Sequence, residues 1–386
     1  MKTVHRIRLV LTTLLLAALI IPPLIRISFT GAVVSEVEQR RLADYPYFGE
    51  LRERVFNRDW MNQMENWLND HIGLRGPLWR IYTRLMHERL GISTVASVIR
   101  GQNGWLYYTL DHNLDIIKGT YPLDEQMTGN IITGQKTLSD WYASRGIHYA
   151  LLLTPSKVSV YPAYLPFEFN PNIETPSKIL EKRLKESNAC NVFNAYDFLL
   201  DNHQGDNEAL LFYKTDTHWT TVATYKVYHS LIPLIIEGAQ PIDVSFSFAR
   251  IQGGLSKALG LNESSDMEES PTVEFSWTSM KESHLEDRLV DSVKSAFKRA
   301  ALPYIKPVLY RNTHVSNGRK LLVYGDSMMD DSWQFPQFLA EHFEQVLILR
   351  LHDPIPEVEE MLHVTDVLMQ TTERKIAVVL PYIEIP

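Results

Sequence analysis

The chain has 386 residues, of which 45% are hydrophobic and 22% are charged. This composition is ordinary for a globular protein and argues against extensive disorder. The formal net charge is −8 at pH 7, and the sequence has no basic stripe or nucleic-acid motif, so nucleic acid is not an expected partner. Because Cys190 is the single cysteine, the chain can form no intrachain disulfide and no cysteine-based metal centre.

The N-terminus carries the pattern of a membrane anchor. A basic cluster at residues 2–8 precedes an uncharged, mostly apolar run at residues 9–25. The run is near the lower length limit for a spanning helix, and the positive-inside tendency places the rest of the chain on the far side of the membrane. We predict a cytoplasmic tip and an uncleaved signal anchor over residues 1–28, with a cleaved signal peptide as the alternative. Residues 29–55 are predicted to form a stalk, and residues 56–386 one folded domain.

The predicted domain begins with helical elements and continues as an α/β alternation. Two amphipathic stretches, at about residues 60–68 and 78–90, precede a hairpin over Val98–Tyr108. Further helices are predicted at 125–144, 177–186, 220–234, 286–300 and 335–343, and strands at 148–153, 209–213, 320–324 and 345–350. A polar stretch at 262–272 is predicted to be a loop. This alternation is typical of a parallel α/β sheet flanked by helices.

A Gly-Asp-Ser tripeptide marks one candidate active-site residue. Gly325-Asp326-Ser327 comes after the short apolar strand and precedes a predicted helix, so Ser327 is expected at the carboxyl edge of the sheet, where α/β proteins bind ligands. The backbone N–H groups of such a turn can stabilise a developing oxyanion. The tripeptide alone is weak evidence, because a Gly-Asp-Ser helix cap has the same sequence.

The second candidate is Asp216-Thr-His218, which lies between a predicted strand and a predicted helix. Two residues apart on an extended segment, the two side chains project to the same side. The carboxylate can then accept the imidazole Nδ1–H and leave Nε2 free to take a proton from a serine hydroxyl. Half of a metal site and a simple helix cap are the competing interpretations of this motif.

The motifs and their order resemble the AlgJ/AlgX-like alginate O-acetyltransferase branch of the SGNH hydrolases. Asp216-Thr-His-Trp-Thr220 precedes Gly325-Asp-Ser327, as in that family, and Gly101-Gln-Asn-Gly-Trp-Leu106 is similar to the family's hairpin. Thr154-Pro-Ser-Lys157 is similar to its Pro-x-Lys segment, and the stretch that ends in Glu373-Arg374 is similar to its last strand. The resemblance implies a flavodoxin-like, circularly permuted SGNH sheet.

The resemblance also implies an activity and its residues. Ser327 is expected to be the nucleophile, His218 the general base and then acid, and Asp216 the residue that orients His218, with no metal and no cofactor. The product is expected to be an O-acetylated polysaccharide outside the cytoplasm, in the periplasm. The expected partners are the polysaccharide acceptor, the inner membrane, and a multipass membrane-bound O-acyltransferase that supplies acetyl groups.

Secondary candidates and rival activities remain open from the sequence. Lys157, Trp219 and Asn312 are weaker candidates for substrate binding. Lys157 could instead position the catalytic loop, and Trp219 could instead pack against the pocket wall. Asn312 is also a candidate oxyanion donor because it lies shortly before the serine strand. A polysaccharide acetylesterase of the same fold would use the same acyl-enzyme. A non-catalytic scaffold of an exopolysaccharide export complex is the rival from another class.

Overall fold

The computed structural model describes residues 12–13, 16, 34–35, 40–45, 58–71, 75–200, 209–261 and 267–384. Almost all of the predicted anchor and most of the predicted stalk lie outside these ranges. No helix within them is both long enough and apolar enough to cross a membrane.

The chain divides into two compact units. The first comprises residues 1–96 with 254–266, and the second comprises residues 97–253 with 267–386. The sequence predicts one folded domain over residues 56–386, and the second unit begins within that range, at Ser97. The elements of the first unit are β1 (Val34–Ser35), β2 (Arg40–Arg41), α3 (Arg58–His71), α4 (Arg75–Leu85), η1 (Met86–Leu90) and α11 (Gly254–Ala258).

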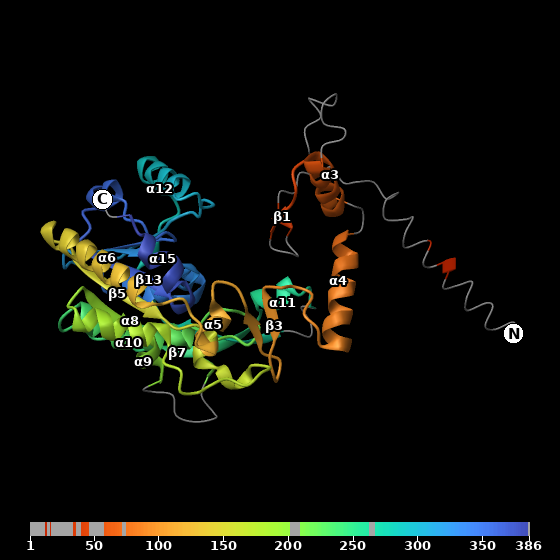
Figure 1. Cartoon of the computed structure of the whole chain (residues 1–386). Coiled ribbons are helices and arrows are strands. Elements are labelled where there is room, and N and C mark those ends of the chain that lie inside the picture. Colours follow the sequence, from red (N-terminus) through yellow and green to blue (C-terminus); the bar gives the residue numbers. More distant parts are fainter. Residues whose placement is uncertain are drawn as a thin grey trace, which may run out of the picture. The chain divides into compact units, whose positions relative to one another are not determined.

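A seven-stranded sheet in the order β6-β5-β13-β11-β12-β10-β9 forms the centre of the second unit (Figure 1). Its strands are β5 (His148–Thr154), β6 (Asn191–Asn194), β9 (Met280–Lys281), β10 (Val308–Arg311), β11 (Lys320–Tyr324), β12 (Gln345–Leu349) and β13 (Asp366–Thr372). Five neighbouring strands, in the order β6-β5-β13-β11-β12, are mutually parallel. β10 pairs antiparallel with both β12 and β9.

The all-parallel sheet that the sequence predicts is therefore corrected to a mixed sheet. The reason is the connection between β10 and β11, which consists only of residues 312–319. A parallel crossover needs about a dozen residues or more to return the chain to the opposite edge. Because this connection is shorter, β10 has to end at the edge where β11 begins.

The order of the parallel strands shows the permuted topology. We renumber the parallel strands so that β11, β12, β13, β5 and β6 become strands 1 to 5. Their order across the sheet, β12-β11-β13-β5-β6, is then the flavodoxin-like order 2-1-3-4-5. In sheets of this order the switch point lies between the first and third strands, and ligands bind outside the carboxyl ends there. In this chain those two strands are β11 and β13. A ligand site is therefore expected at the residues that follow Tyr324 and Thr372.

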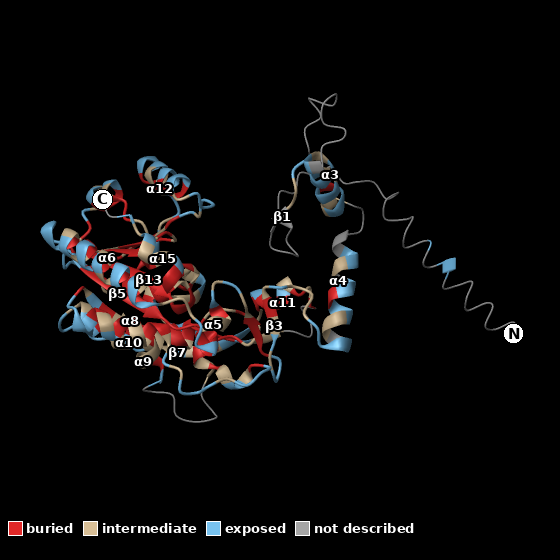
Figure 2. Cartoon of the chain, in the orientation of Figure 1, coloured by how far each residue is buried: buried red, intermediate tan, exposed pale blue. Residues whose placement is uncertain are grey.

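Successive side chains along the strands of the sheet pack alternately into two hydrophobic cores. Leu152, Val323 and Leu368 point into one core, whereas their neighbours Leu151 and Leu322 point into the other. Helices cover both faces, so the strands are buried on both sides and appear in the sequence as nearly continuous apolar runs. Figure 2 shows the strands of this unit as buried and the outer surfaces of its helices as exposed.

Within the described residues the helices of the second unit are α5 (Asn113–Lys118), α6 (Glu125–Ser144), α7 (Lys157–Val160), α8 (Pro176–Glu186), α9 (Ala195–Leu200), α10 (Thr221–Ile235), α12 (Asp287–Arg299), α13 (Phe335–Ala340), α14 (Pro356–Met361) and α15 (Ile376–Val379). The sequence predicts α6, α8, α10, α12 and α13 but not α5, α7, α9, α14 and α15. Two N-caps explain where the long helices start. Asp124 accepts a hydrogen bond from the Met127 N–H before α6, and Thr220 accepts one from the Ala223 N–H before α10.

Two antiparallel hairpins complete the unit. The hairpin of β3 (Val98–Arg100) and β4 (Leu106–Tyr108) confirms the prediction for this segment. The hairpin of β7 (Ser245–Gln252) and β8 (Met267–Glu274) was not predicted, and β8 replaces most of the loop expected at 262–272. The strand expected at 209–213 is also absent from the described residues, where a single bridge joins Phe212 to Trp219.

Candidate active site

Ser327 starts a short turn at the carboxyl edge of β11. The strand ends at Tyr324, and residues Ser327–Met329 form the 3-10 turn η3. Gly325 permits a close approach here, because a Cβ at this position would lie 2.7 Å from the Gln370 Oε1 atom and 2.8 Å from the Met329 Cγ atom. The turn therefore places the serine directly outside the switch-point strand, as the motif predicts.

Asp326 fixes this turn and does not act as the acid of a triad. Its Oδ1 atom accepts a hydrogen bond from the Met328 N–H at 2.9 Å, and its Oδ2 atom accepts one from the Thr372 N–H at 3.1 Å. Burial alone would raise the pKa of Asp326, but Lys375, Arg374 and the Thr372 bond hold that pKa below its ordinary value. Asp326 is thus an ionised cap that joins the end of β11 to the end of β13.

Asp216 and His218 form the expected dyad. The His218 Nδ1 atom lies 2.6 Å from the Asp216 Oδ1 atom, and the same oxygen accepts the backbone N–H groups of Thr217 at 2.6 Å and His218 at 3.1 Å. The two side chains meet because this carboxylate closes a turn, and not through the strand alternation that the sequence suggests. The Nε2 atom of His218 is buried and has no hydrogen-bond partner among the described residues.

Two tryptophans bring the serine turn and the dyad together. The ring of Trp333 stacks on His218 with a centroid distance of 4.8 Å, and its indole N–H donates to the Ser327 carbonyl at 3.0 Å. The indole N–H of Trp219, the residue after His218, donates to the Met328 carbonyl at 3.0 Å. Each tryptophan thus links the histidine segment to the backbone of the serine turn.

Lys157 holds the loop that carries the dyad. The Nζ atom of this buried residue donates to the carbonyls of Tyr213 at 3.0 Å, Lys214 at 3.1 Å and Asp216 at 2.5 Å. Burial lowers the pKa of Lys157 to about 7. Since an ammonium group has three N–H donors and all are used here, the contacts of Lys157 fit positioning of the loop that carries Asp216 and His218 and not substrate binding.

The opposite side of the same loop is held by residues that the sequence analysis did not select. Glu268 on β8 accepts hydrogen bonds from the Lys214 N–H at 2.6 Å and the Thr215 N–H at 2.8 Å. Thr215 in turn accepts the Gly253 N–H at 3.2 Å through its hydroxyl. Because the β7–β8 hairpin was not predicted, no local sequence signal could place Glu268 next to residue 215.

Two weaker candidates are not placed to contact substrate. Trp219 is fully buried and packs against Phe335 at a centroid distance of 5.5 Å, so its ring has no face available to a sugar. Asn312 lies at the amino edge of β11, where its N–H donates to the Glu344 carbonyl, and its side-chain amide donates to Ala340 and Thr278. It is therefore at the opposite edge from Ser327 and cannot donate to an oxyanion there.

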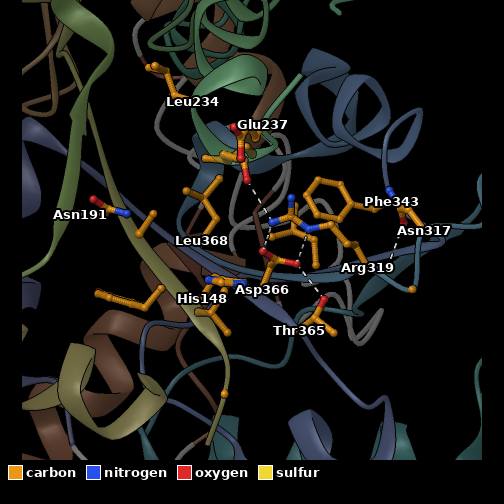
Figure 3. A pocket seen from close by; sticks show the side chains of 17 residues that line it. His148, Asn191, Leu234, Glu237, Asn317, Arg319, Phe343, Thr365, Asp366 and Leu368 are labelled. Carbon is orange, nitrogen blue, oxygen red and sulfur yellow. Dashed lines mark hydrogen bonds and ion pairs between the residues drawn. The ribbon is translucent and has the colours of Figure 1, made fainter. Parts of the chain in front are cut away.

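A cavity of about 660 Å³ also lies at the amino edge of the sheet (Figure 3). Its charged centre is the pair of Arg319 and Asp366, and Arg319 also donates to the Ile235 carbonyl at 3.0 Å. The labelled polar groups at its centre point toward one another (Figure 3). This cavity is separate from the serine, and its central charges are already neutralised by their own partners.

The described residues contain no group of three or more His, Cys, Asp or Glu side chains arranged to hold a metal ion. Acyl transfer by a serine, a histidine and an aspartate requires none. At this site the carboxylate of Asp216 can fix the tautomer of His218, so that its Nε2 atom can accept a proton from a hydroxyl nucleophile.

Comparison with known proteins assigns the family. The family model described as "SGNH hydrolase-like domain, acetyltransferase AlgX" matches residues 98–294, which is just over half of the 386 residues. The chain belongs to this family. Asp216 and His218 lie within the matched range of the AlgX-like domain, whereas Ser327 lies beyond it.

Solved structures of PatB1 agree with the fold of the AlgX-like domain. Bacillus cereus PatB1 aligns with a TM-score of 0.54 and 14% identity, over 74% of this chain and 99% of PatB1. PatB1 with a sulfonyl adduct aligns with a TM-score of 0.53 and 13% identity, over 75% and 97% of the two chains. The O-acetyltransferase domain of Pseudomonas putida AlgJ aligns with a TM-score of 0.47 and 15% identity, over 73% and 92%. No curated protein matches the sequence significantly.

Proposed function

We propose that this chain transfers acetyl groups to hydroxyls of an extracytoplasmic polysaccharide through an acetyl-Ser327 intermediate. The observation that carries the proposal is the buried, unpartnered Nε2 atom of His218, whose Nδ1 atom is held by Asp216 and whose ring stacks on the tryptophan bound to Ser327. The membership of the AlgX-like acetyltransferase family supports an acetyl group as the group transferred.

The proposed reaction has two half-reactions. The Ser327 Oγ atom attacks the carbonyl carbon of an acetyl donor while His218 Nε2 accepts the hydroxyl proton, and the leaving group departs with that proton. A sugar hydroxyl then attacks the acetyl-serine, its proton passes to Nε2, and the proton returns to Ser327 as the ester bond breaks. The backbone N–H of Ser327 is the proposed oxyanion donor, because it opens the turn at the strand end.

The acetyl donor requires a partner if the domain lies in the periplasm. The N-terminal pattern of residues 1–28 supports an anchor in the inner membrane, whereas acetyl-CoA is made in the cytoplasm. A multipass membrane-bound O-acyltransferase would therefore have to deliver acetyl groups to Ser327. Neither the anchor nor this partner is needed for the chemistry of the isolated domain.

Acetyl transfer and hydrolysis can be separated in one assay. Purified protein is given an activated acetyl ester, with and without oligosaccharide acceptors, and both acetate and acetylated sugar are measured. We expect acetylated sugar to form at the expense of acetate, and Ser327→Ala to reduce both products by on the order of 10³-fold or more. Acetate as the sole product with every acceptor would identify the protein as an esterase instead.

A further inference from the structure

The helix α4 of the first unit has an exposed apolar face. Four of its large side chains follow the spacing i, i+3, i+4 and i+7, which places them on one side of the helix. They are Leu78 (46% exposed), Ile81 (65%), Tyr82 (48%) and Leu85 (55%). A helix of a globular protein ordinarily turns such a stripe toward the core. On α4 the stripe lies on the surface instead, and Figure 2 shows the exposed positions in pale blue.

The opposite side of α4 is the covered one. Thr83 is fully buried, and Trp79 is partly buried. The spacing of two residues between Ile81 and Thr83 corresponds to about half a helical turn, so the exposed stripe is distinct from the surface through which α4 packs. Contiguous exposed apolar surface of this kind marks a site for a protein or membrane partner.

The segment formed by α4 and the following turn η1 is also basic. Residues 75–90 contain four arginines and one glutamate, in a chain whose formal net charge is −8. Arg84 and Arg89 are among the exposed residues of this segment. The helix α3 of the same unit also exposes Met61 and Leu68, but it contains three acidic residues and one arginine. Exposed apolar surface and positive charge therefore coincide at α4 and not at α3.

This combination fits an anionic lipid surface. An amphipathic helix that is rich in arginine and has large apolar side chains on one face lies flat on a bilayer. Its apolar side chains enter the acyl boundary, and its basic residues attract anionic headgroups. With 11 residues α4 is too short to cross a bilayer. Pairing with a second copy is disfavoured, because it would bring together two segments with excess positive charge.

We infer that α4 binds the surface of a membrane that contains anionic lipids. The inference goes beyond the proposed acetyl transfer, because α4 belongs to the first unit, whereas Ser327, His218 and Asp216 belong to the second. It is also distinct from the proposed anchor at residues 1–28, since α4 lies along the bilayer and does not cross it. This helix thus provides a second contact with the membrane, and that contact depends on charge.

The test follows the environment of one residue on the stripe, so that an anchor elsewhere in the chain does not affect the result. The full-length protein carries Cys190→Ser, which removes its single cysteine, and Ile81→Cys labelled with an environment-sensitive NBD fluorophore. It is mixed with an excess of vesicles made of phosphatidylcholine alone, or of phosphatidylcholine and phosphatidylglycerol in equal parts. A blue shift of the emission, and quenching by nitroxide groups on the lipid acyl chains, report burial of the label in the bilayer.

We expect both signals with the anionic vesicles and much weaker signals with phosphatidylcholine alone. Added salt should reverse part of both signals, because it screens the attraction between arginines and headgroups. A control label at Lys136→Cys, an exposed position on α6, should show neither signal with either kind of vesicle.

Two changes separate the apolar and the charge contributions. Leu85→Ser removes one apolar side chain of the stripe and should weaken both signals. Arg84→Gln with Arg89→Gln should lower the ratio of buried to exposed label by on the order of tenfold or more, because each basic residue near an anionic surface contributes about fivefold. The matched control, Arg288→Gln with Arg299→Gln, removes the same charge from exposed positions on α12 and should change neither signal.

Several outcomes would overturn the inference. Absence of both signals, or equal signals with the two kinds of vesicle, would exclude a site for anionic lipids. A label that is already buried without vesicles would show that the chain itself covers the stripe, and burial that rises with protein concentration would assign the stripe to a second copy. Hydrolysis of an activated acetyl ester in solution should equal that of the wild type in Leu85→Ser, so loss of membrane contact is distinguishable from failure of the proposed function.

Discussion

At the scale of single residues, the site separates groups that react from groups that hold them. Ser327, His218 and Asp216 are proposed to carry the reaction, and their positions depend on side chains with no role in proton transfer. Trp333 contacts both His218 and the Ser327 carbonyl, and Lys157 binds the carbonyl of Asp216 itself. The reacting groups of a catalytic site keep their productive geometry only if such supporting contacts hold them in place.

Lys157 gives a pH-dependent prediction. Its pKa is lowered from its ordinary 10.5 to about 7 because the group is buried. Between these two values the unfolded chain binds a proton that the folded chain releases, so folding stability rises with pH across this window. The unfolding midpoint of the wild type should therefore increase relative to that of Lys157→Met from about pH 7 to about pH 9. If the difference between the unfolding midpoints of the wild type and of Lys157→Met does not change with pH, the lowered pKa of Lys157 is contradicted.

At the scale of elements, the loop of residues 213–219 is held from two sides. Lys157 binds its carbonyls, and Glu268 binds its N–H groups. Gly253 lies against the loop so closely that a Cβ there would be 2.3 Å from the Thr215 carbonyl carbon. The backbone of this loop therefore has little room to move without displacing Asp216.

Gly253→Ala should displace the loop and lower kcat for acetyl-ester hydrolysis by on the order of 10²-fold, because a shift of about 1 Å is enough to misalign a catalytic group. The matched control is Gly129→Ala on α6, where a Cβ meets nothing within 4 Å. That change should leave kcat unaffected and raise stability by about 0.5–1 kcal/mol. Equal kcat values for the two variants would show that the loop tolerates displacement.

The elements also show what the sequence can predict. The α6 helix and the β11 strand have the predicted bounds, because apolar periodicity and a capping aspartate are local signals. For Lys157 and Trp219 the sequence leaves two roles open each, and the contacts that distinguish them are made with residues distant in sequence. Trp333 and Glu268 were not selected, because their contacts with the site exist only in the folded chain.

At the scale of the whole molecule, the order of strands decides where the site is. The chain enters the sheet at β5, yet the serine comes after β11, the first strand of the flavodoxin-like order. The sequence resemblance anticipated this permutation. It did not anticipate that β10 runs antiparallel to β12 and β9. The direction of β10 follows from the short connection of residues 312–319 to β11.

Glu359 on α14 connects several layers of the second unit. Its buried carboxylate accepts the hydroxyls of Tyr142 at 2.8 Å and Tyr324 at 2.9 Å, and it pairs with Arg145. Glu359→Ala should reduce the free energy of unfolding by about 3 kcal/mol, because it leaves these groups without their partner. The adjacent exposed Glu360→Ala should stay within about 0.5 kcal/mol of the wild type. Chemical denaturation of both variants measures the difference, and equal losses would contradict this role.

The central claim is that Ser327 becomes acetylated with the help of His218. The most direct measurement is peptide mass spectrometry of protein quenched during turnover of an activated acetyl ester. We predict one acetyl group on the peptide that contains Ser327, much less of it in His218→Ala, and none in Ser327→Ala. An acetyl group on a different residue, or full turnover of the ester by Ser327→Ala, would contradict the account.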